Sequence, residues 1–445
     1  MMSFSVDKQT LDDLNIFTKK GRDSVFGLFN NTRTRGGAEI LEQMFRYPLS
    51  DAGAINQRSQ VIHFFQSGKA LFPFKEEWFD LIEQYLSNAD ERSKLSHDEN
   101  KLGRTFNNLI GADTEYRQIA KALAAIFDFI NAFHQFLDQM KSNKNAMPYH
   151  EELVAIKSIL DDQEIQKLTR AAATEKQTYE KTAEYDQVLR FKKKDLLLKM
   201  LSHAYQLDVY IAVATVAAEE NFVFAKALPA DLLDMTLEGV YHPLLENAVG
   251  NNLQVTPRSN VIFLTGANMA GKSTFMKSMG IVVFLAHMGF PVPATKMEFP
   301  VMDGLYSTIN LPDNLSMGYS HFYAEVLRVK KVAEQLSLSK KIFVIFDELF
   351  RGTNVKDAYE ATVALTAAFA RKKNCIFVIS THIIEAGEEL KERCDNIHFT
   401  YLPTLMEGAK PVYTYRLAEG ITSDRHGMII INNEGIIDIL KINNK

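Results

Sequence analysis

Two glycines, a lysine and a serine stand close together in this sequence at a spacing that suits phosphate chemistry. Segment 266–274 reads GANMAGKST, so four residues separate Gly266 from Gly271, and Lys272 and Ser273 follow directly. Glycines allow backbone N–H groups to close around a phosphate, a lysine can reach the outer phosphate oxygens, and a serine hydroxyl can ligate Mg²⁺. This set of residues therefore favours a loop that cradles the phosphates of a bound nucleotide.

The surroundings of this loop match what a phosphate-binding loop requires. An apolar run at residues 261–264 precedes it, and a helical pattern at residues 274–287 follows it. A glycine-rich turn could fit the spacing by chance, but the order of strand, loop and helix makes that interpretation the weaker one. We expect ATP to be bound by the following residues: Gly266, Asn268, Gly271, Lys272, Ser273 and Thr274.

Two carboxylates end a second apolar run. The run at residues 342–346 leads into Asp347 and Glu348, and ligands bind at the carboxyl ends of strands in open parallel sheets. As isolated acids these two residues would be ordinary solvated loop residues. Because a phosphate-binding loop precedes them, we interpret Asp347 as a Mg²⁺ ligand together with Ser273. Glu348 is then placed to polarise the attacking water.

A third apolar run, at residues 375–379, ends in Ser380, Thr381 and His382. A histidine just after a strand can simply cap a turn, and taken alone that is the better interpretation. Beside a phosphate loop and two carboxylates, His382 can instead hydrogen-bond a γ-phosphate and respond to the state of the nucleotide. We predict this second, catalytic role.

The elements that must position these residues differ between the two halves of the chain. The three apolar runs are typical of strands buried on both faces of a parallel sheet, which predicts a doubly wound α/β domain. Residues 116–141, by contrast, repeat apolar side chains at helical spacing. Turn-forming residues cluster at 229–257. We therefore expect a helical domain over residues 1–229 and an α/β domain over residues 230–445.

Composition places the chain among globular proteins. Of its 445 residues, 46% are hydrophobic and 24% are charged, and domains of roughly 100–200 residues are usual, so more than one is expected. No apolar run approaches the ~18 residues of a membrane span, and no signal peptide is evident, so we expect a cytoplasmic protein. Two cysteines, Cys375 and Cys394, argue against a disulfide framework and a cysteine-based zinc site. The net charge of −5 neither requires nor excludes nucleic acid.

Together the motifs resemble those of the MutS family, whose ATPase domain is of the ABC type. The Asn-Met pair inside segment 266–274 is similar to the family's phosphate loop, and the run FDELFRGT at residues 346–353 is similar to its acidic motif. Thr381 and His382 match the switch histidine that follows. The resemblance implies that the protein binds ATP with Mg²⁺ and hydrolyses the nucleotide.

A fourth segment is similar to the signature segment through which MutS subunits meet. It covers residues 313–325, with His321 where the family has a threonine. The resemblance implies a homodimer with composite ATP sites, in which Ser320 acts on the nucleotide of the opposite subunit. The tail at residues 416–435 is similar to the family's helix-turn-helix, but an Arg-His pair at residues 425–426 replaces the usual Ser-Tyr pair. Its part in dimer contacts stays open.

The resemblance extends into the first half of the chain. Segments 24–37, 47–51, 55–58 and 207–218 are similar to the family's core or lever domain, and residues 241–245 to the entry into its ATPase domain. The implied fold is an α-helical lever or core domain followed by an α/β P-loop NTPase domain of the ABC type. We find no counterpart of the mismatch-reading domain with its Phe-x-Glu wedge. We therefore expect no preference for mismatched over paired DNA.

Two functions stay open on this evidence. The resemblance implies DNA binding, and a basic run supplies four cations that could contact DNA phosphates: Arg190, Lys192, Lys193 and Lys194. A charge run on a helix is more often a solvated face. The alternative is an ATP-regulated dimeric scaffold that controls a protein partner without binding DNA. A transporter-type or structural-maintenance ATPase is disfavoured, because the Leu-Ser-Gly-Gly run of those proteins is missing.

Overall fold

The chain separates into two units. The structure, a computed structural model, describes residues 4–17, 23–88, 90, 95, 109–141, 147–229, 232–267, 269–309, 321–350, 353–407, 410–422 and 439. One unit, called here the sheet unit, contains Met1–Phe29, Met44–Ser59 and Val216–Lys445. The other, the helical unit, contains Asn30–Gln43 and Gln60–Thr215. This division differs from the single boundary expected at residues 229–230, because parts of the N-terminal region pack within the sheet unit.

The sheet unit is built on a seven-stranded sheet in the order β1-β9-β10-β11-β6-β12-β15, and every pairing except β12 with β15 is parallel. Its strands are β1 (Ser5–Val6), β6 (Val261–Gly266), β9 (Gly304–Thr308), β10 (Ile342–Asp347), β11 (Ile376–Ser380), β12 (Ile397–Leu402) and β15 (Ala418–Glu419). The three predicted strands are confirmed as the neighbours β10, β11 and β6, and all three are buried along almost their whole length. This part of the chain is a mixed α/β domain with a parallel-rich sheet.

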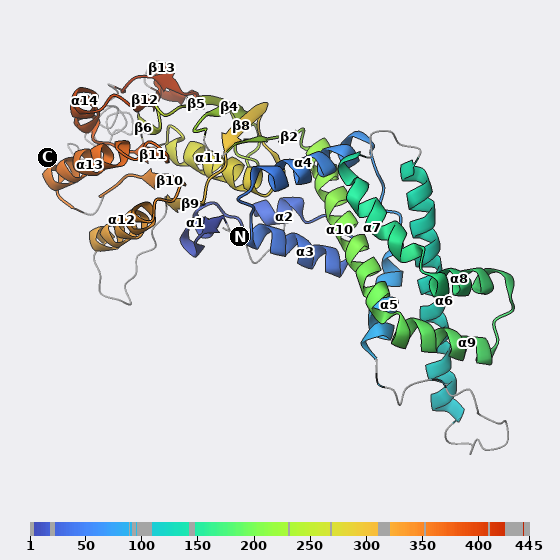
Figure 1. Cartoon of the computed structure of the whole chain (residues 1–445). Helices are drawn as coiled ribbons and strands as arrows, with labels where there is room; N and C mark the ends of the chain where they lie inside the picture. The colour runs from blue at the N-terminus through green and yellow to red at the C-terminus, as the bar shows by residue number, and fades with distance from the viewer. Residues whose placement is uncertain are drawn as a thin grey trace. The chain divides into compact units, whose positions relative to one another are not determined.

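Helices pack on both faces of this sheet. They are α11 (Lys272–His287), α12 (His321–Ser337), α13 (Val355–Ala370) and α14 (Ile384–Arg393), labelled in Figure 1. Side chains alternate along β10, so Val344 and Phe346 join an apolar cluster with residues of α12 and α13. Ile345 faces α11 instead, where a Cβ added to Gly280 would lie 3.1 Å from its Cδ1. Glycine at this position therefore allows α11, the helix predicted after the phosphate loop, to approach the strand closely.

The first described residues extend the central sheet. Strand β1 pairs in parallel with β9, and α1 (Lys8–Asp13) follows it. The Phe4 ring stacks on His287 of α11, with the ring centroids 4.0 Å apart. Asp7 caps α1, because its side chain accepts a hydrogen bond from the backbone N–H of Thr10. These contacts explain why the N-terminal segment belongs to the sheet unit.

Smaller sheets surround the central one. A four-stranded sheet has the order β3-β8-β4-β5, made of β3 (Lys226–Leu228), β8 (Lys296–Pro300), β4 (Met235–Val240) and β5 (Asn251–Val255). Two further pairs are β2 (Val223–Phe224) with β7 (Pro291–Val292) and β13 (Thr404–Glu407) with β14 (Lys410–Tyr413). Asn251 of β5 donates from Nδ2 to the carbonyl of Tyr415 at 2.9 Å and accepts from the N–H of Leu417 at 2.8 Å. Asn251 thereby fixes the segment that follows β14.

The described residues of the helical unit form helices and no strand, as predicted for this half of the chain. Its helices are α5 (Glu76–Ser87), α6 (Leu109–Lys141), α7 (His150–Leu160), α8 (Gln163–Thr174) and α9 (Tyr179–Asp186), with a 3₁₀ turn at Met147–Tyr149 and a π-helical turn at Gln187–Lys192. The segments α3 (Arg35–Arg46), α4 (Ala52–Ser67) and α10 (Lys194–Glu219) run from one unit into the other, and α2 (Val25–Phe29) belongs to the sheet unit. In the described ranges, no helix combines the length and apolarity needed to cross a bilayer.

The basic run offered as a DNA contact makes ion pairs inside the helical unit. Arg190 has a side-chain exposure of 1%, and its Nη2 lies 2.6 Å from Oδ2 of Asp186. Lys193 lies 2.8 Å from Asp162 and 2.9 Å from Glu164. Neither interpretation left open for the run, a DNA contact or a solvated face, holds for Arg190, which is buried against Asp186 in the π-helical turn, and Lys193 is engaged by two carboxylates. Of the four cations in the basic run, Lys192 and Lys194 are left as candidates for contact with DNA phosphates.

Candidate nucleotide-binding site

The predicted phosphate loop requires glycine at both of its ends. Gly266 has a φ of +141°, and a Cβ added there would lie 3.1 Å from the carbonyl oxygen of Leu402. Gly271 has a φ of +99° at the N-cap of α11, and a Cβ there would lie 3.0 Å from the ring of Tyr415. Both φ values lie in the region that L side chains rarely adopt. The two glycines therefore allow the chain to leave β6 and enter α11 through a tight loop.

Lys272, the first residue of α11, lies under this loop. Its exposure is 4%, and its Nζ donates to the carbonyls of Gly266 at 2.8 Å and Ala267 at 3.0 Å. The ammonium group is thus held at the N-terminal end of α11, where the aligned peptide dipoles add positive potential. A lysine and a helix N-terminus at one place form an environment suited to phosphate oxygens.

Asp347 connects the ends of three neighbouring strands. Its Oδ2 accepts a hydrogen bond from Ser273 Oγ at 2.5 Å, and its Oδ1 accepts one from Ser380 Oγ at 2.8 Å. Ser273 follows the loop after β6, while Asp347 and Ser380 end β10 and β11 and are register partners. The predicted metal ligands Ser273 and Asp347 are thus side by side. Among the described residues no cluster of three or more His, Cys, Asp or Glu could hold a metal, so a cation here would need phosphate or water ligands, as Mg²⁺ commonly has.

Glu348 and His382 contact each other beside Asp347. Oε1 of Glu348 is in hydrogen-bonding contact with Nε2 of His382, and the side chains are 11% and 39% exposed. Glu348 has a φ of +54°, unusual for a residue with a side chain, and its N–H donates to the carbonyl of Ser380 at 3.0 Å. The left-handed turn at Glu348 follows directly after the last residue of β10. The sequence predicted both residues but not the contact between them.

A cavity of about 600 Å³ opens at the carboxyl ends of these strands. It is lined by Met269, residues 271–275 and Glu348, together with residues 245–249 and Tyr415. A second cavity of about 450 Å³ is lined by Glu348 and His382. Glu348 therefore borders both spaces, and the larger cavity adjoins Lys272.

Two residues of the cavity wall were not predicted as site residues. Tyr415 is 46% exposed and has a φ of +54°, and His242 lines the same cavity. Burial, with the charge of Lys277 nearby, lowers the pKa of His242 to about 4, so this imidazole is neutral at pH 7. No local sequence pattern marks Tyr415. Its position beside the loop depends on the pairing of β14 with β13 and on the hydrogen bond that its carbonyl accepts from Asn251.

Several predicted residues lie outside the described part of the chain. They are Asn268 of the loop, Ser320 of the signature segment and the pair at residues 425–426 of the tail. Thr274 is described, lies in the first turn of α11 and lines the larger cavity. The roles assigned to all of these residues stay predictions.

Comparison with known proteins matches each half of the chain to a protein-family model. A family model described as MutS domain V matches residues 262–441, and one described as MutS domain III matches residues 9–214. The chain belongs to the MutS family. The DNA mismatch repair protein MutS of Fusobacterium nucleatum is 25% identical over 378 residues, which cover 81% of this chain and 41% of that protein. The proteins of the same name from Bacillus mycoides and Bacillus cereus are each 29% identical over 238 residues, covering 52% of this chain and 26% of theirs. This chain thus spans less than half the length of these relatives.

The two MutS domain matches cover different parts of the described structure. The domain V match contains the phosphate loop, the ends of β10 and β11, and Tyr415, whereas the cavity-lining residues between Val240 and Asn251 precede it. The domain III match contains all of the helical unit but its last residue, and also most of α1 together with α2 and α4. A MutS domain III match therefore includes segments that pack within the sheet unit of this protein.

Proposed function

We propose that this MutS-family protein binds ATP with Mg²⁺ in the larger cavity and hydrolyses it. One observation carries the proposal: Asp347 receives hydrogen bonds from Ser273 and Ser380, and thereby joins the phosphate loop to the two strand ends that carry the predicted catalytic groups. Lys272 and the N-terminus of α11 supply positive charge for the β- and γ-phosphates. Ser273 and Asp347 would hold Mg²⁺, which neutralises charge on the phosphates when bound.

Glu348 is the proposed general base. A water held between Glu348 and the γ-phosphate loses a proton to the carboxylate as its oxygen bonds to phosphorus, and the bond from phosphorus to the β,γ-bridging oxygen breaks. The products are ADP and inorganic phosphate. His382 contacts the Glu348 carboxylate and can hold it in the orientation that accepts the proton. Tyr415, half exposed in the lining of the larger cavity beside Gly271, offers a flat surface on which the base of the nucleotide can stack.

We further propose that ATP joins two copies of the chain, with Ser320 of one copy completing the site of the other, as the MutS resemblance implies. The dimer would couple ATP turnover to movement of the helical elements and act on DNA in the cytoplasm. The printed names of the relatives, DNA mismatch repair protein MutS, support DNA as the target. One observation favours the alternative of a scaffold for a protein partner: Arg190 is buried, and Lys193 is paired with carboxylates.

Two measurements test these proposals. The full chain should bind a fluorescent ATP analogue in the presence of Mg²⁺, and Lys272→Ala should abolish tight binding while the variant still folds and melts in a cooperative transition. Equal nucleotide affinity in the variant would refute the site. Gel shifts with homoduplex, mismatched and branched DNA at several salt concentrations, with and without ATP, distinguish a DNA-binding dimer from a scaffold, because phosphate contacts weaken steeply with salt.

A further inference from the structure

The second cavity meets the larger one at Glu348, which is the one described residue that lines both. Residues 348–350 after β10 and residues 381–383 after β11 line the second cavity, together with Thr353, Val355 and Ala358 at the start of α13. Its volume of about 450 Å³ falls within the range of roughly 300–1,000 Å³ that holds small ligands. A phosphate ion with several water molecules therefore fits in this space.

Hydrogen-bond donors in the lining of the second cavity suit a small oxyanion. Thr381 is 2% exposed, and its hydroxyl accepts the N–H of Ile383 at 3.0 Å. None of the described residues accepts the proton of this hydroxyl, so the O–H group can donate to a ligand. The N-terminal end of α13, where aligned peptide dipoles place positive potential, belongs to the same lining. These groups favour an anion with several oxygen atoms over an apolar ligand.

Glu348 sets the charge between the two cavities. Its side chain is 11% exposed, and repulsion between like charges is stronger beside a partly buried group than in bulk water. An ionised Glu348 therefore opposes the passage of phosphate. In the proposed hydrolysis Glu348 accepts the proton of the attacking water, so it is neutral when inorganic phosphate forms. The charge that opposes movement of phosphate past Glu348 is thus absent directly after bond cleavage.

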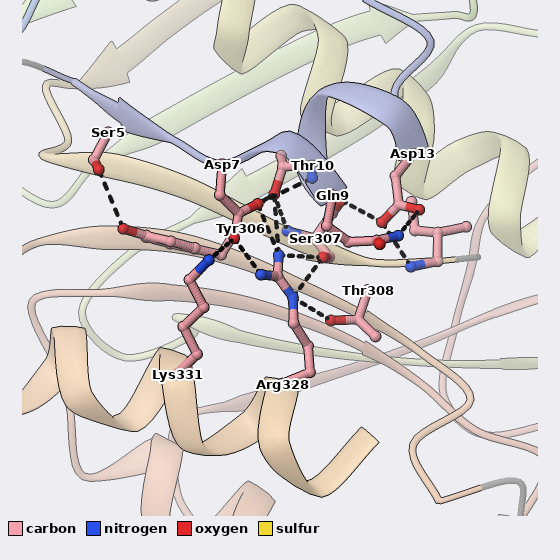
Figure 2. Close-up of polar contacts among 11 residues, drawn as sticks. Ser5, Asp7, Gln9, Thr10, Asp13, Tyr306, Ser307, Thr308, Arg328 and Lys331 are labelled. Carbon is pink, nitrogen blue, oxygen red and sulfur yellow. Dashed lines mark hydrogen bonds and ion pairs between the residues drawn. The ribbon is translucent and has the colours of Figure 1, made fainter. Parts of the chain in front are cut away.

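The end of β9, on the other side of β10, is occupied by polar contacts (Figure 2). Asp13 of α1 accepts hydrogen bonds there from Ser307 Oγ at 2.6 Å and from the N–H of Ile309 at 3.0 Å. Arg328 of α12 donates from Nη2 to the carbonyl of Ser307 at 2.6 Å and from Nε to Thr308 Oγ1 at 3.2 Å. Figure 2 shows the side chains of Asp13 and Arg328 meeting at this strand, and none of these residues lines either cavity. The second cavity therefore lies on the β11 side of β10.

Each of the two cavities has an exposed residue in its lining. Val355, the first residue of α13, is 78% exposed, whereas Ala358, one turn further along the helix, is 5% exposed. The second cavity thus extends from a buried wall at Ala358 to solvent at Val355. Met269 lines the larger cavity and is 75% exposed. Ligands in the two cavities can therefore reach solvent at different places.

We propose that the second cavity receives the inorganic phosphate formed by hydrolysis and releases it past Val355, while ADP leaves through the larger cavity. The inference rests on the proposed function, which supplies the phosphate. No bond forms or breaks in this step. Because the two products use different openings, phosphate leaves while ADP is still held at Lys272 and the N-terminus of α11.

Full-length Val355→Trp, with Lys356→Trp as the control, tests this route. Lys356 is the next residue of α13, its side chain is 83% exposed, and it lines neither cavity. In a single turnover, acid quenching measures bond cleavage, and a fluorescent phosphate-binding protein measures phosphate in solution. In Val355→Trp the lag between cleavage and phosphate release should lengthen by ~10-fold or more, while the cleavage rate and the dissociation rate of a fluorescent ADP stay within about twofold. Lys356→Trp should behave as the wild type.

A second pair of variants tests the charge of the released ion without adding bulk. Val355→Glu places a carboxylate at the opening, and Val355→Gln has nearly the same size without the charge. Both should fold, because the position is exposed and an acidic residue is favourable in the first turn of a helix. At low salt, phosphate release should be about threefold slower in Val355→Glu than in Val355→Gln. The difference should disappear at ~1 M salt, where charges are screened within a few ångströms.

Three outcomes would overturn the inference. They are phosphate that appears together with bond cleavage in folded Val355→Trp, equal slowing in Val355→Trp and Lys356→Trp, and equal release from the Glu and Gln variants at low salt. Failure of the proposed function is recognised separately, as the absence of bond cleavage in the wild type. Phosphorus NMR of inorganic phosphate added with ADP then still tests the cavity, since Val355→Glu should bind phosphate more weakly than Val355→Gln.

Discussion

The hydroxyl of Ser273 donates a hydrogen bond of 2.5 Å to Oδ2 of Asp347, although 74 positions separate the two residues in the sequence. The other carboxylate oxygen, Oδ1, accepts a hydrogen bond of 2.8 Å from Ser380. One carboxylate therefore has one oxygen directed at the phosphate loop and the other at the end of β11. The two serines support the same carboxylate from opposite sides, so their contributions to metal binding can be separated by mutation.

Ser273→Ala should raise the Mg²⁺ concentration for half-maximal ATP hydrolysis more than Ser380→Ala does. Ser273 is a proposed ligand, whereas Ser380 only orients Asp347, and loss of an orienting hydrogen bond commonly costs about 10-fold or more in metal affinity. We expect roughly 10-fold for Ser380→Ala and ~100-fold for Ser273→Ala. Titrations with Mg²⁺ at saturating ATP measure both values. Equal effects would mean that Ser273, like Ser380, acts only through Asp347.

Glu348→Gln should slow hydrolysis by ~10²-fold or more, the scale that general-base catalysis contributes, because the amide cannot accept the proton of water. Nucleotide affinity should stay near that of the wild type, since the side chain keeps its size. Single-turnover rates and equilibrium binding of an ATP analogue measure the two quantities. Glu388→Gln, at an exposed position of α14, is the control for the loss of one carboxylate and should hydrolyse ATP at the wild-type rate. Wild-type turnover in Glu348→Gln would remove Glu348 from the mechanism.

The predictions that succeeded rest on patterns within a few neighbouring residues. The apolar runs that became β6, β10 and β11 each have a length and texture typical of a buried parallel strand, and the helix expected at residues 274–287 is α11. The carboxyl ends of neighbouring parallel strands meet at one edge, which explains why Ser273, Asp347 and Ser380 are found together.

The features that were missed depend on distant partners. Strand β1 has two residues and no periodicity, and its partner β9 lies far away in the sequence, with Ser5 paired to Gly304. Tyr415 gains its place from Asn251 rather than from its own neighbours. Arg190 looked like one of a row of solvated cations, but Asp186 lies one turn before it and the π-helical turn directs it inward. A run of charged residues in the sequence does not show which of its side chains are buried and which are solvated.

Stability should fall in mild acid because of His287. This side chain is fully buried, its Nδ1 bonds the carbonyl of Val283 at 2.7 Å, and its Nε2 accepts the N–H of Met302 at 3.0 Å. Burial lowers its pKa from 6.5 to about 4, against the opposing effect of the Val283 carbonyl. Above pH 6.5 the imidazole is neutral in the folded and unfolded chains. As the pH falls from 6.5 towards 4, the unfolded chain binds the proton first, so about 3 kcal/mol of stability is lost.

Chemical denaturation between pH 7.5 and pH 4.5 measures this loss. In His287→Leu, which cannot titrate, the free energy of unfolding should be lower at pH 7.5 but should fall less steeply with acid. The exposed His63 gives the control: His63→Gln should keep the wild-type slope. Parallel pH profiles for wild type and His287→Leu would show that other groups cause the acid sensitivity.

ATP and dimerisation should strengthen each other if Ser320 completes the site of the opposite subunit. Nucleotide binding and association are then thermodynamically linked, and hydrolysis depends on protein concentration. Two variants damage opposite halves of one composite site. Lys272→Ala keeps Ser320 but cannot bind ATP, whereas Ser320→Arg binds ATP but spoils the site of its partner. Each variant alone should be inactive.

Mixing the two variants distinguishes a site shared between subunits from a self-contained one. A mixed dimer holds one site with both defects and one wholly intact site, made of the loop from the Ser320→Arg chain and the signature segment from the Lys272→Ala chain. Hydrolysis should therefore reappear in the mixture, with up to half of the dimers mixed at random pairing. If the mixture stays inactive while native mass spectrometry shows mixed dimers, the action of Ser320 across the interface is refuted. The site must then lie within one chain, or turnover must require two intact sites at once.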